Sequence, residues 1–259
     1  MNYQDKTVVV TGAAKGIGAA CAKLFYEAGA NVALLDITSE DTNIEDERCL
    51  FVHCNVSIES EVKAAFEQIQ QRFNQVDILV NNAGIQRYGT VTETSVEVWD
   101  EVMNVNLKSL FLCSKHAIPS MQQQKKGVII NMASVQGFVS QPKVAAYTTA
   151  KTAILGLTRS IAVDYSPDIR CVAVCPGTID TPMLRDSFAL SPDPNEVLQE
   201  CIDMHLTKRI GTAEEVAELV LYLCDDKASF ITGQAIRIDG GLGITIQGSK
   251  KEGQTPKGA

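Results

Sequence analysis

The sequence predicts one α/β domain, in which a doubly wound parallel sheet is flanked by helices. Short apolar runs alternate along the chain with segments of helical length, a pattern typical of strand–helix–strand units. The runs are mostly continuous in their apolar character, as expected for strands buried on both faces of a parallel sheet. The chain has 259 residues with no internal repeat or dividing linker, which suits a single large domain.

Seven apolar runs are the expected strands, and the segments between them supply the expected helices. The strands are predicted at 7–10, 32–36, 50–54, 76–80, 127–133, 170–175 and 235–239. The helices are predicted at 19–28, 59–73, 95–122, 145–165 and 213–224. Because helices join the successive strands, the strands should lie parallel, with ligand-binding loops at their C-terminal ends.

Two segments interrupt this alternation. Residues 181–209 are rich in Pro and Asp and predict a mobile substrate loop with short helices, of the kind that covers an active site. The domain is expected to span 1–248, and the polar, Gly-rich end at 249–259 is expected to be disordered.

Composition argues against several classes of function. The net charge is −8 and there is no Lys/Arg stripe, which disfavours a nucleic-acid surface. No apolar run has the length of a membrane helix, and the first residues lack the apolar stretch of a signal peptide, so a cytoplasmic location is expected. The eight cysteines are scattered, which predicts reduced thiols and no metal site. His53, His116 and His205 have no ligand or triad neighbour at useful spacing and are expected to be structural or surface groups.

A glycine-rich loop, TGAAKGIG at 11–18, follows the first expected strand and opens a helix. Gly12 permits a tight turn, Gly16 lets the backbone approach a pyrophosphate, and Gly18 allows close helix–strand packing. The spacing is G-x-x-x-G-x-G rather than the general G-x-G-x-x-G, so the strand–turn–helix context carries the inference. This loop predicts dinucleotide binding, and an ordinary glycine turn is the alternative.

The end of the second strand suggests which dinucleotide is bound. Asp36 stands where a carboxylate can accept hydrogen bonds from the adenosine ribose and repel a 2′-phosphate, which favours NAD over NADP. Lys15 could instead attract that phosphate, and Asp36 could simply begin a turn. Asn55 and Val56 follow the third strand where an adenine would rest, although a loop asparagine satisfied by its own backbone is equally consistent.

Further motifs stand at later strand ends: NNAG at 81–84, Ser134, YTTAK at 147–151 and PGTIDT at 176–181. Together with the glycine loop, and in this order from about Lys6 to Gly241, they resemble the short-chain dehydrogenase/reductase family. The resemblance implies a Rossmann-like, seven-stranded parallel sheet. It also implies hydride transfer between a nicotinamide and a carbinol or carbonyl carbon, and usually a homotetramer. Outward faces of the helices near 95–122 and 145–165, and of the last helix with the final strand, would be covered in such an assembly.

Carried over residue by residue, the resemblance implies a catalytic set of Asn106, Ser134, Tyr147 and Lys151, with Asn81 bracing the sheet. Thr181 would hold the nicotinamide carboxamide. The implied cofactor-binding residues are Gly12, Lys15, Gly16, Ile17, Gly18, Asp36, Asn55, Val56, Asn82, Ala83, Gly84, Tyr147, Lys151, Pro176, Gly177, Ile179 and Thr181. Two positions depart from the common pattern. Asn55 replaces an aspartate, and Lys15 is more typical of relatives that use NADP.

Tyr147 and Lys151 are four residues apart and therefore share one face of a helix. A nearby ammonium is expected to lower the pKa of the phenol, so that it can exchange a proton with an alcohol near neutrality. Ser134 would fix the substrate oxygen, Lys151 would also bond the nicotinamide ribose, and Asn106 would hold a water that leads to solvent. Taken alone, the pair could equally belong to an ordinary amphipathic helix.

The substrate pocket is expected to draw on the loops after the fourth, fifth and sixth strands and on the substrate loop. Its candidate residues are Gln86, Gln136, Phe138, Gln141, Thr178, Met183 and Leu184. Three glutamines suggest a polyol, a sugar or another hydroxylated secondary alcohol oxidised with NAD, unless they are merely solvated. One alternative is an NADPH-dependent reductase of 3-oxoacyl thioesters. Another, of a different class, is a catalytically silent nucleotide-binding sensor.

Overall fold

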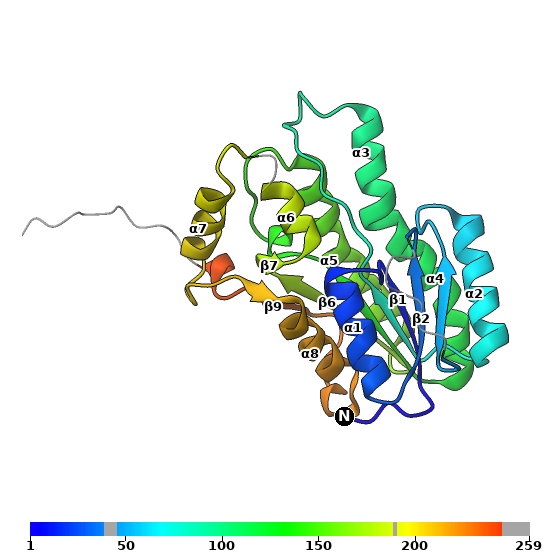
Figure 1. Ribbon diagram of the computed structural model, residues 1–259. Helices are drawn as coiled ribbons and strands as arrows, with labels where there is room; N and C mark the ends of the chain where they lie inside the picture. The colour runs from blue at the N-terminus through cyan, green and yellow to red at the C-terminus, as the bar shows by residue number, and fades with distance from the viewer. Residues whose placement is uncertain (39–45, 189–190, 245–259) are drawn as a thin grey trace, which may run out of the picture.

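The computed structural model describes residues 1–38, 46–188 and 191–244, which include a seven-stranded parallel sheet of order β3-β2-β1-β4-β5-β6-β9 (Figure 1). All seven predicted strands are confirmed, with ends that shift by one or two residues. They are β1 Thr7–Thr11, β2 Asn31–Asp36, β3 Cys49–His53, β4 Ile78–Asn81, β5 Gly127–Met132, β6 Ile169–Pro176 and β9 Ala235–Ile238. The order reverses between β1 and β4, and open α/β sheets bind ligands beyond the C-terminal ends of the strands at such a switch point.

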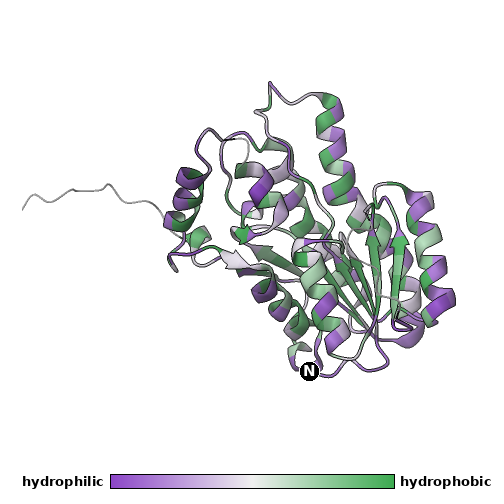
Figure 2. Cartoon of the chain, viewed as in Figure 1, coloured by the Kyte–Doolittle hydropathy of each residue, from purple (hydrophilic) through white to green (hydrophobic). Residues whose placement is uncertain are grey.

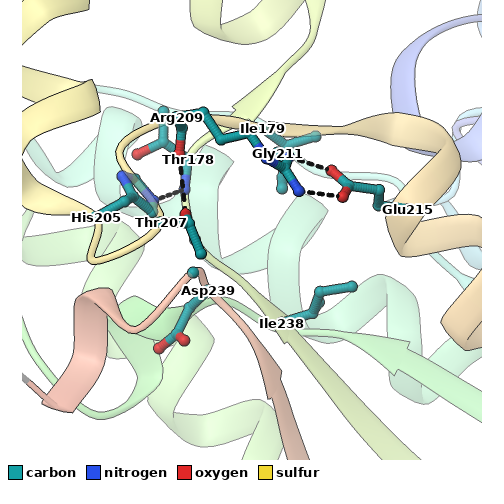
Figure 3. A pocket seen from close by; sticks show the side chains of 11 residues that line it. Thr178, Ile179, His205, Thr207, Arg209, Gly211, Glu215, Ile238 and Asp239 are labelled. Atoms are coloured by element: carbon teal, nitrogen blue, oxygen red, sulfur yellow. Dashed lines mark hydrogen bonds and ion pairs between the residues drawn. The ribbon is translucent and has the colours of Figure 1, made fainter.

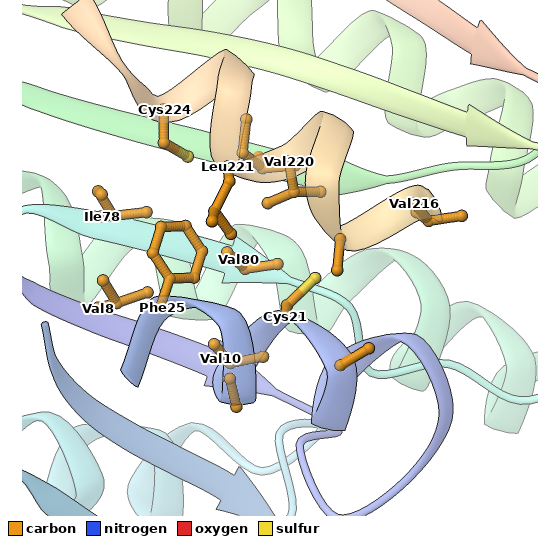
Figure 4. Packing of buried hydrophobic residues seen from close by; sticks show 14 of the residues in the cluster. Val8, Val10, Cys21, Phe25, Ile78, Val80, Val216, Val220, Leu221 and Cys224 are labelled. Carbon is orange, nitrogen blue, oxygen red and sulfur yellow. The ribbon is translucent and has the colours of Figure 1, made fainter. Parts of the chain in front are cut away.

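Helices cover both faces of the sheet, which explains why the strands are apolar throughout. Helices α1 Gly16–Glu27 and α8 Ala213–Cys224 lie side by side on one face, and α2 Glu59–Phe73, α4 Ser109–Gln124 and α5 Ala145–Tyr165 cover the other. Val8 and Val10 of β1 face α1 and α8, where Phe25 fills the core between strand and helix (Figure 4). Val9, between them, faces the opposite layer. Figure 2 shows apolar strands enclosed by helices whose outer faces are polar.

The helix predicted over 95–122 contains an irregular turn. It consists of α3 Val96–Met103, a π-helical segment Asn104–Lys108, and α4. Asn106 lies in this π-helical turn and is fully buried, and its side chain bonds the backbone of Ile85. Widening of a helical turn of this kind is commonly found at functional sites. An apolar periodicity does not reveal one inserted residue, so the sequence predicts a continuous helix here.

The predicted excursion forms two short helices beyond the C-terminal ends of β6 and β9, α6 Pro182–Phe188 and α7 Pro194–Met204. Within the described part of these helices no side chain is fully buried. A small parallel pair that the sequence does not predict, β7 Ile179–Asp180 and β8 Gly211–Thr212, closes the base of the excursion. The excursion is therefore joined at its two ends by the β7–β8 pair, and its described helices lie at the surface rather than in the core.

Single-turn helices complete the described chain: 135–137, 226–228 and 242–244. The expected disordered tail at 249–259 lies outside the described residues. Among the described helices, none is long and apolar enough to cross a membrane. Residues 1–38, 46–188 and 191–244 also contain no group of three His, Cys, Asp or Glu side chains that could hold a metal ion.

Candidate active site

The glycine loop is shaped by close contacts that only glycine allows. Gly12 and Gly16 have φ values of +63° and +59°, in the left-handed region that other residues rarely adopt. A Cβ on Gly12 would lie 2.8 Å from Cα of Ala83, and one on Gly18 would overlap the carbonyl oxygen of Gly12. The loop is thus packed directly against the segment that follows β4, a contact that the sequence did not predict.

Hydrogen bonds join the glycine loop to the NNAG segment. Thr11 Oγ1 accepts from the backbone N–H groups of Asn82 and Ala83, at 2.9 and 3.0 Å. The side-chain amide of Asn82 donates to the carbonyl oxygens of Thr11 and Gly12, both at 3.0 Å. Asn82 is therefore a brace between the two loops, so it would shape the cofactor site from behind rather than only line it.

The start of α1 has the features of an anion site. Within the fully described helix Gly16–Glu27, the first turn holds no acidic residue and no side chain caps the N-terminus. The first N–H groups of a helix carry partial positive charge and favour a phosphate. Thr181, from the segment after β6, lies on the other side: a Cβ on Gly16 would be 3.4 Å from its Cγ2. These residues fit a dinucleotide whose pyrophosphate rests on the helix and whose nicotinamide end reaches Thr181.

Asp36 bonds the glycine loop on one side and the turn after β2 on the other. Its Oδ2 accepts from Ala14 N at 3.0 Å, and its Oδ1 accepts from Thr38 N at 3.1 Å. Lys15 is exposed at the start of α1. Asn55 adopts the loop role that the sequence left open, because its Oδ1 accepts from both N and Oγ of Ser57, at 3.1 and 2.7 Å. Val56 is buried next to it.

Ser134, Tyr147 and Lys151 come together at the C-terminal ends of β5 and β6. Lys151 Nζ lies 5.5 Å from the centre of the Tyr147 ring, and the side chains of Ser134 and Tyr147 are hydrogen-bonded. Lys151 is 4% exposed and donates to the carbonyl oxygen of Met132 at 2.7 Å, a partner that the sequence did not predict. An ammonium has three donors, so two remain for other partners.

The expected lowering of the tyrosine pKa is wrong for the chain without a ligand. Burial raises the pKa of Tyr147 to about 12, and the hydrogen bond from Ser134 opposes this only in part. Burial lowers the pKa of Lys151 to about 8. Desolvation disfavours the charged form of each group, so it opposes the phenolate and the ammonium alike. The sequence shows that the two side chains share a helix face, but not that both are removed from water.

Asn106 and Lys151 meet around Gly84. The amide of Asn106 donates to Ile85 O at 2.8 Å, and its Oδ1 accepts from Ile85 N at 2.7 Å. A Cβ on Gly84 would lie 3.4 Å from Asn106 Oδ1 and 3.7 Å from Lys151 Nζ. The asparagine therefore fixes the loop after β4 beside the lysine, and its side chain keeps one N–H and one lone pair for a further partner.

Asn81 lies in the buried centre of the sheet. Its Nδ2 donates to Asn131 Oδ1 at 2.9 Å and to Ser114 Oγ at 3.3 Å, which joins β4, β5 and α4. Asn131 in turn donates to Thr158 Oγ1 of α5 at 3.0 Å. This polar chain orients α5, the helix that carries Tyr147 and Lys151.

The candidate substrate residues divide into two groups. Gln136 and Phe138 follow Ser134 directly, and Gln136 Oε1 accepts from Thr148 Oγ1 at 3.4 Å. Phe138 is exposed and stacks on Arg237, with the guanidinium carbon 5.4 Å from the ring centre. The others lie on the surrounding loops and on α6: Gln86, Gln141, Thr178, Met183 and Leu184.

Two neighbours of this site were not predicted. Tyr88, which is 45% exposed, lies close enough to Tyr147 to raise the pKa of its phenol. Its position four residues after Gly84, at the same sheet edge, was a signal available in the sequence. His205 lines a cavity of about 110 Å³ next to Gly177, Thr178 and Asp239 (Figure 3). The described lining of this cavity does not include Ser134, Tyr147 or Lys151, so the cavity is separate from that cluster.

Comparisons with known proteins agree with this geometry. A family model described as enoyl-(acyl carrier protein) reductase matches residues 12–243. "Dehydrogenase/reductase SDR family member 6" of Aquarana catesbeiana is 39% identical, with 92% of this chain and 98% of that protein aligned. The 2-(R)-hydroxypropyl-CoM dehydrogenase of Xanthobacter autotrophicus is 39% identical, with 91% and 98% aligned. The ligand-free aldohexose dehydrogenase of Thermoplasma acidophilum superposes with a TM-score of 0.90 at 39% identity, over 96% of this chain and 98% of that one.

The match extends from the glycine loop to the turn after β9, over the seven-stranded parallel sheet that the resemblance implies. These three relatives are each more than 30% identical to this chain over nearly its whole length, and each is named a dehydrogenase or a dehydrogenase/reductase. The chain therefore belongs to the short-chain dehydrogenase/reductase family, whose members are NAD(P)-dependent oxidoreductases acting on CH–OH groups.

Proposed function

We propose that this protein is an NAD-dependent dehydrogenase of a hydroxylated secondary alcohol, such as a polyol or a sugar. The observation that carries the proposal is the cluster of Ser134, Tyr147 and Lys151 next to a glycine loop that Asp36 faces. The first three residues supply the groups for proton transfer at a carbinol. Asp36 selects the cofactor.

In the proposed reaction Ser134 donates a hydrogen bond to the substrate oxygen and fixes it for hydride transfer. Tyr147 takes the hydroxyl proton in oxidation and returns it in reduction. Lys151, 5.5 Å from the ring, stabilises the phenolate when it carries a proton itself. The nicotinamide, when bound, accepts or supplies the hydride. Because burial raises the pKa of Tyr147 to about 12, the ligand-free enzyme holds its phenol protonated and ready for reduction.

The choice of NAD rests on charge at the end of β2. Asp36 accepts from Ala14 N of the glycine loop, so its carboxylate lies where a ribose bound to that loop would sit. A 2′-phosphate there would meet a negative charge. Lys15 is exposed at the helix start, so its ammonium can remain in solvent rather than oppose Asp36.

The substrate class is inferred from the pocket and from one solved relative. Gln136 lies beside Ser134, and Gln86 and Gln141 lie on flanking loops, which provides amide groups for several hydroxyls. The aldohexose dehydrogenase that superposes over most of the chain has a polyhydroxylated substrate by name. The description of the matched family model names an acyl-carrier substrate, which keeps a second candidate, an NADPH-dependent reductase of 3-oxoacyl thioesters.

We test the proposal by following NADH formation with NAD and a panel of aldoses, polyols and simple secondary alcohols, with NADP in parallel. Turnover with NAD is expected, and Tyr147→Phe should lower kcat by at least roughly a thousandfold. Tyr165→Phe, at the other end of the same helix, is the matched control and should keep full activity. Turnover only with NADPH and acyl thioesters would replace the proposed substrate class. NADH binding without turnover would favour a silent sensor.

A homotetramer and a cytoplasmic location complete the proposal. Phe111 of α4 and Val163 of α5 are 51% and 80% exposed, and Phe230, after α8, is fully exposed. Large apolar side chains on these outer faces support an assembly that covers them. Analytical ultracentrifugation of the purified chain measures the state directly, and a monomer at micromolar concentration would contradict it.

A further inference from the structure

His205 connects three parts of the molecule that are distant in sequence. It directly follows α7, is 2% exposed, and lies against the loop after β6 and the turn after β9 (Figure 3). A Cβ on Gly177 would be 2.9 Å from His205 Nε2, and one on Gly240 would be 3.1 Å from its Cδ2. The ring is thus held tightly, and the segments on either side of it cannot shift without moving it.

Both ring nitrogens of His205 have backbone partners. Nδ1 lies 2.6 Å from the carbonyl oxygen of Cys201, and Nε2 lies 3.2 Å from the backbone N of Thr178. A carbonyl can only accept and a backbone N–H can only donate. The ring must therefore be neutral, with its proton on Nδ1, so that Nε2 accepts from Thr178.

We propose that His205 is a positioning residue that ties α7 to the Gly177–Thr178 backbone and so holds the segment that receives the nicotinamide end of the cofactor. The inference rests on the proposed function, which assigns Gly177 to Thr181 to that end. It explains why a histidine, rather than an apolar residue, fills this position. Only a side chain with a donor and an acceptor at opposite ends can bond a helix carbonyl and a loop N–H together.

The test compares two ligands that share the adenosine diphosphate half of the cofactor. NADH and ADP-ribose are titrated by calorimetry against the full-length protein and its His205 variants, because ADP-ribose lacks the nicotinamide. His205→Asn keeps a donor near Cys201 but does not reach Thr178, and His205→Phe removes both bonds. Both should weaken NADH roughly tenfold, as expected for a buried N–H left without its acceptor, and leave ADP-ribose within about twofold.

His205→Gln is the conservative variant, because its amide oxygen can reach the place of Nε2. It should restore NADH affinity to within about threefold of wild type. His53→Gln, an exposed histidine at the end of β3, is the matched control and should leave the NADH to ADP-ribose affinity ratio unchanged.

Each other outcome contradicts a stated proposal. Unchanged NADH affinity in the Asn and Phe variants would overturn the positioning role alone. Equal weakening of both ligands, with a lower melting temperature, would reduce His205 to a structural residue. If the Asn and Phe variants do not fold, His205→Gln still decides, since an NADH affinity more than about threefold below that of wild type would overturn the proposal. Failure of wild type to bind either ligand would contradict the proposed dinucleotide site itself.

Discussion

Two regions meet at the C-terminal edge of the sheet, and they are built differently. The loops after β1 and β4 are fixed by glycine contacts and by the bonds of Thr11 and Asn82. The excursion that carries α6 and α7 has no fully buried side chain within its described helices, and its main attachments are β7–β8, an exposed ion pair and His205. The first region suits a ligand that is always the same, and the second can adapt or move.

The two regions should also respond differently to substitution. A side chain enlarged in the fixed region would clash with the surrounding backbone, so the substitution should lower both the stability of the fold and the affinity for the cofactor. A side chain changed in the excursion is surrounded by solvent, so the substitution should mainly change the substrate kinetics. The predictions below therefore test whether substitutions in one region leave the properties of the other region unchanged.

The largest effect is expected from Gly18→Ala. The new Cβ would overlap Gly12 O and lie 2.5 Å from Asn82 Nδ2, so the glycine loop and the NNAG segment would have to separate. We expect a loss of roughly 3 kcal/mol or more in the free energy of unfolding, or no soluble protein, as for other overpacked sites. Urea denaturation and NADH titration measure both consequences.

Gly156→Ala is the matched control for this change. It lies in α5, and its Cβ would meet only the tip of Arg159, at 4.0 Å. Replacing a helical glycine in open space should stabilise the protein by about 1 kcal/mol. A Gly18→Ala protein as stable as the Gly156→Ala protein would show that the glycine loop is not the rigid region described above.

The next largest effect concerns Lys151, whose burial lowers its pKa from 10.5 to about 8. The charged form is the disfavoured one, so the cost is full below pH 8 and is relieved as the pH rises from 8 to 10.5, where the unfolded chain binds more protons. Lys151→Met should therefore be inactive yet more stable than wild type at pH 7, by up to roughly 3 kcal/mol. The loss of the bond to Met132 O offsets about 1 kcal/mol of this gain.

Thermal unfolding of both proteins across pH 7 to about 10.5 measures this difference. The stability advantage of the variant should shrink steadily above pH 8, because wild type loses its buried charge. A constant difference across this range would mean that folding does not lower the pKa of Lys151, so that the lysine stays charged in both the folded and the unfolded chain.

The sequence predicted the framework well, for reasons visible in particular elements. The bounds of α2, α5 and α8 follow from apolar periodicity, and the strands follow from continuous apolar runs such as 7–10. The glycine contacts were predictable because the motif implies its own geometry. By contrast, the π-helical turn at Asn106, the bond from Lys151 to Met132 O and the bonds of His205 depend on backbone groups from distant segments. A local sequence pattern cannot predict which distant backbone groups a side chain will bond.

A moderate effect is expected at Asp36, which belongs to the fixed region but faces the ligand. Asp36→Ser removes the carboxylate that we propose to accept from the ribose and to repel a 2′-phosphate. The ratio of kcat/KM for NAD to that for NADP should fall by roughly 10- to 100-fold, mostly through KM. Lys15→Ser in the same background should return part of the preference, if the exposed ammonium attracts the phosphate. An unchanged ratio in Asp36→Ser would mean that other residues select the cofactor.

The smallest effect is expected in the excursion, at the ion pair of Asp180 with Arg185, 2.9 Å apart between β7 and α6. Arg185 is largely exposed, so water screens the pair, and Arg185→Gln should change the melting temperature by less than about 2 °C. The pair nevertheless joins α6, which carries the proposed substrate residues Met183 and Leu184, to β7, so its loss should raise the substrate KM about two- to threefold. Steady-state kinetics and NADH titration of one preparation measure both quantities. Exposed Arg72→Gln on α2, which leaves the excursion intact, should change neither. If NADH affinity fell as much as KM rose, the excursion would be energetically part of the cofactor site, and the two regions would not be separable.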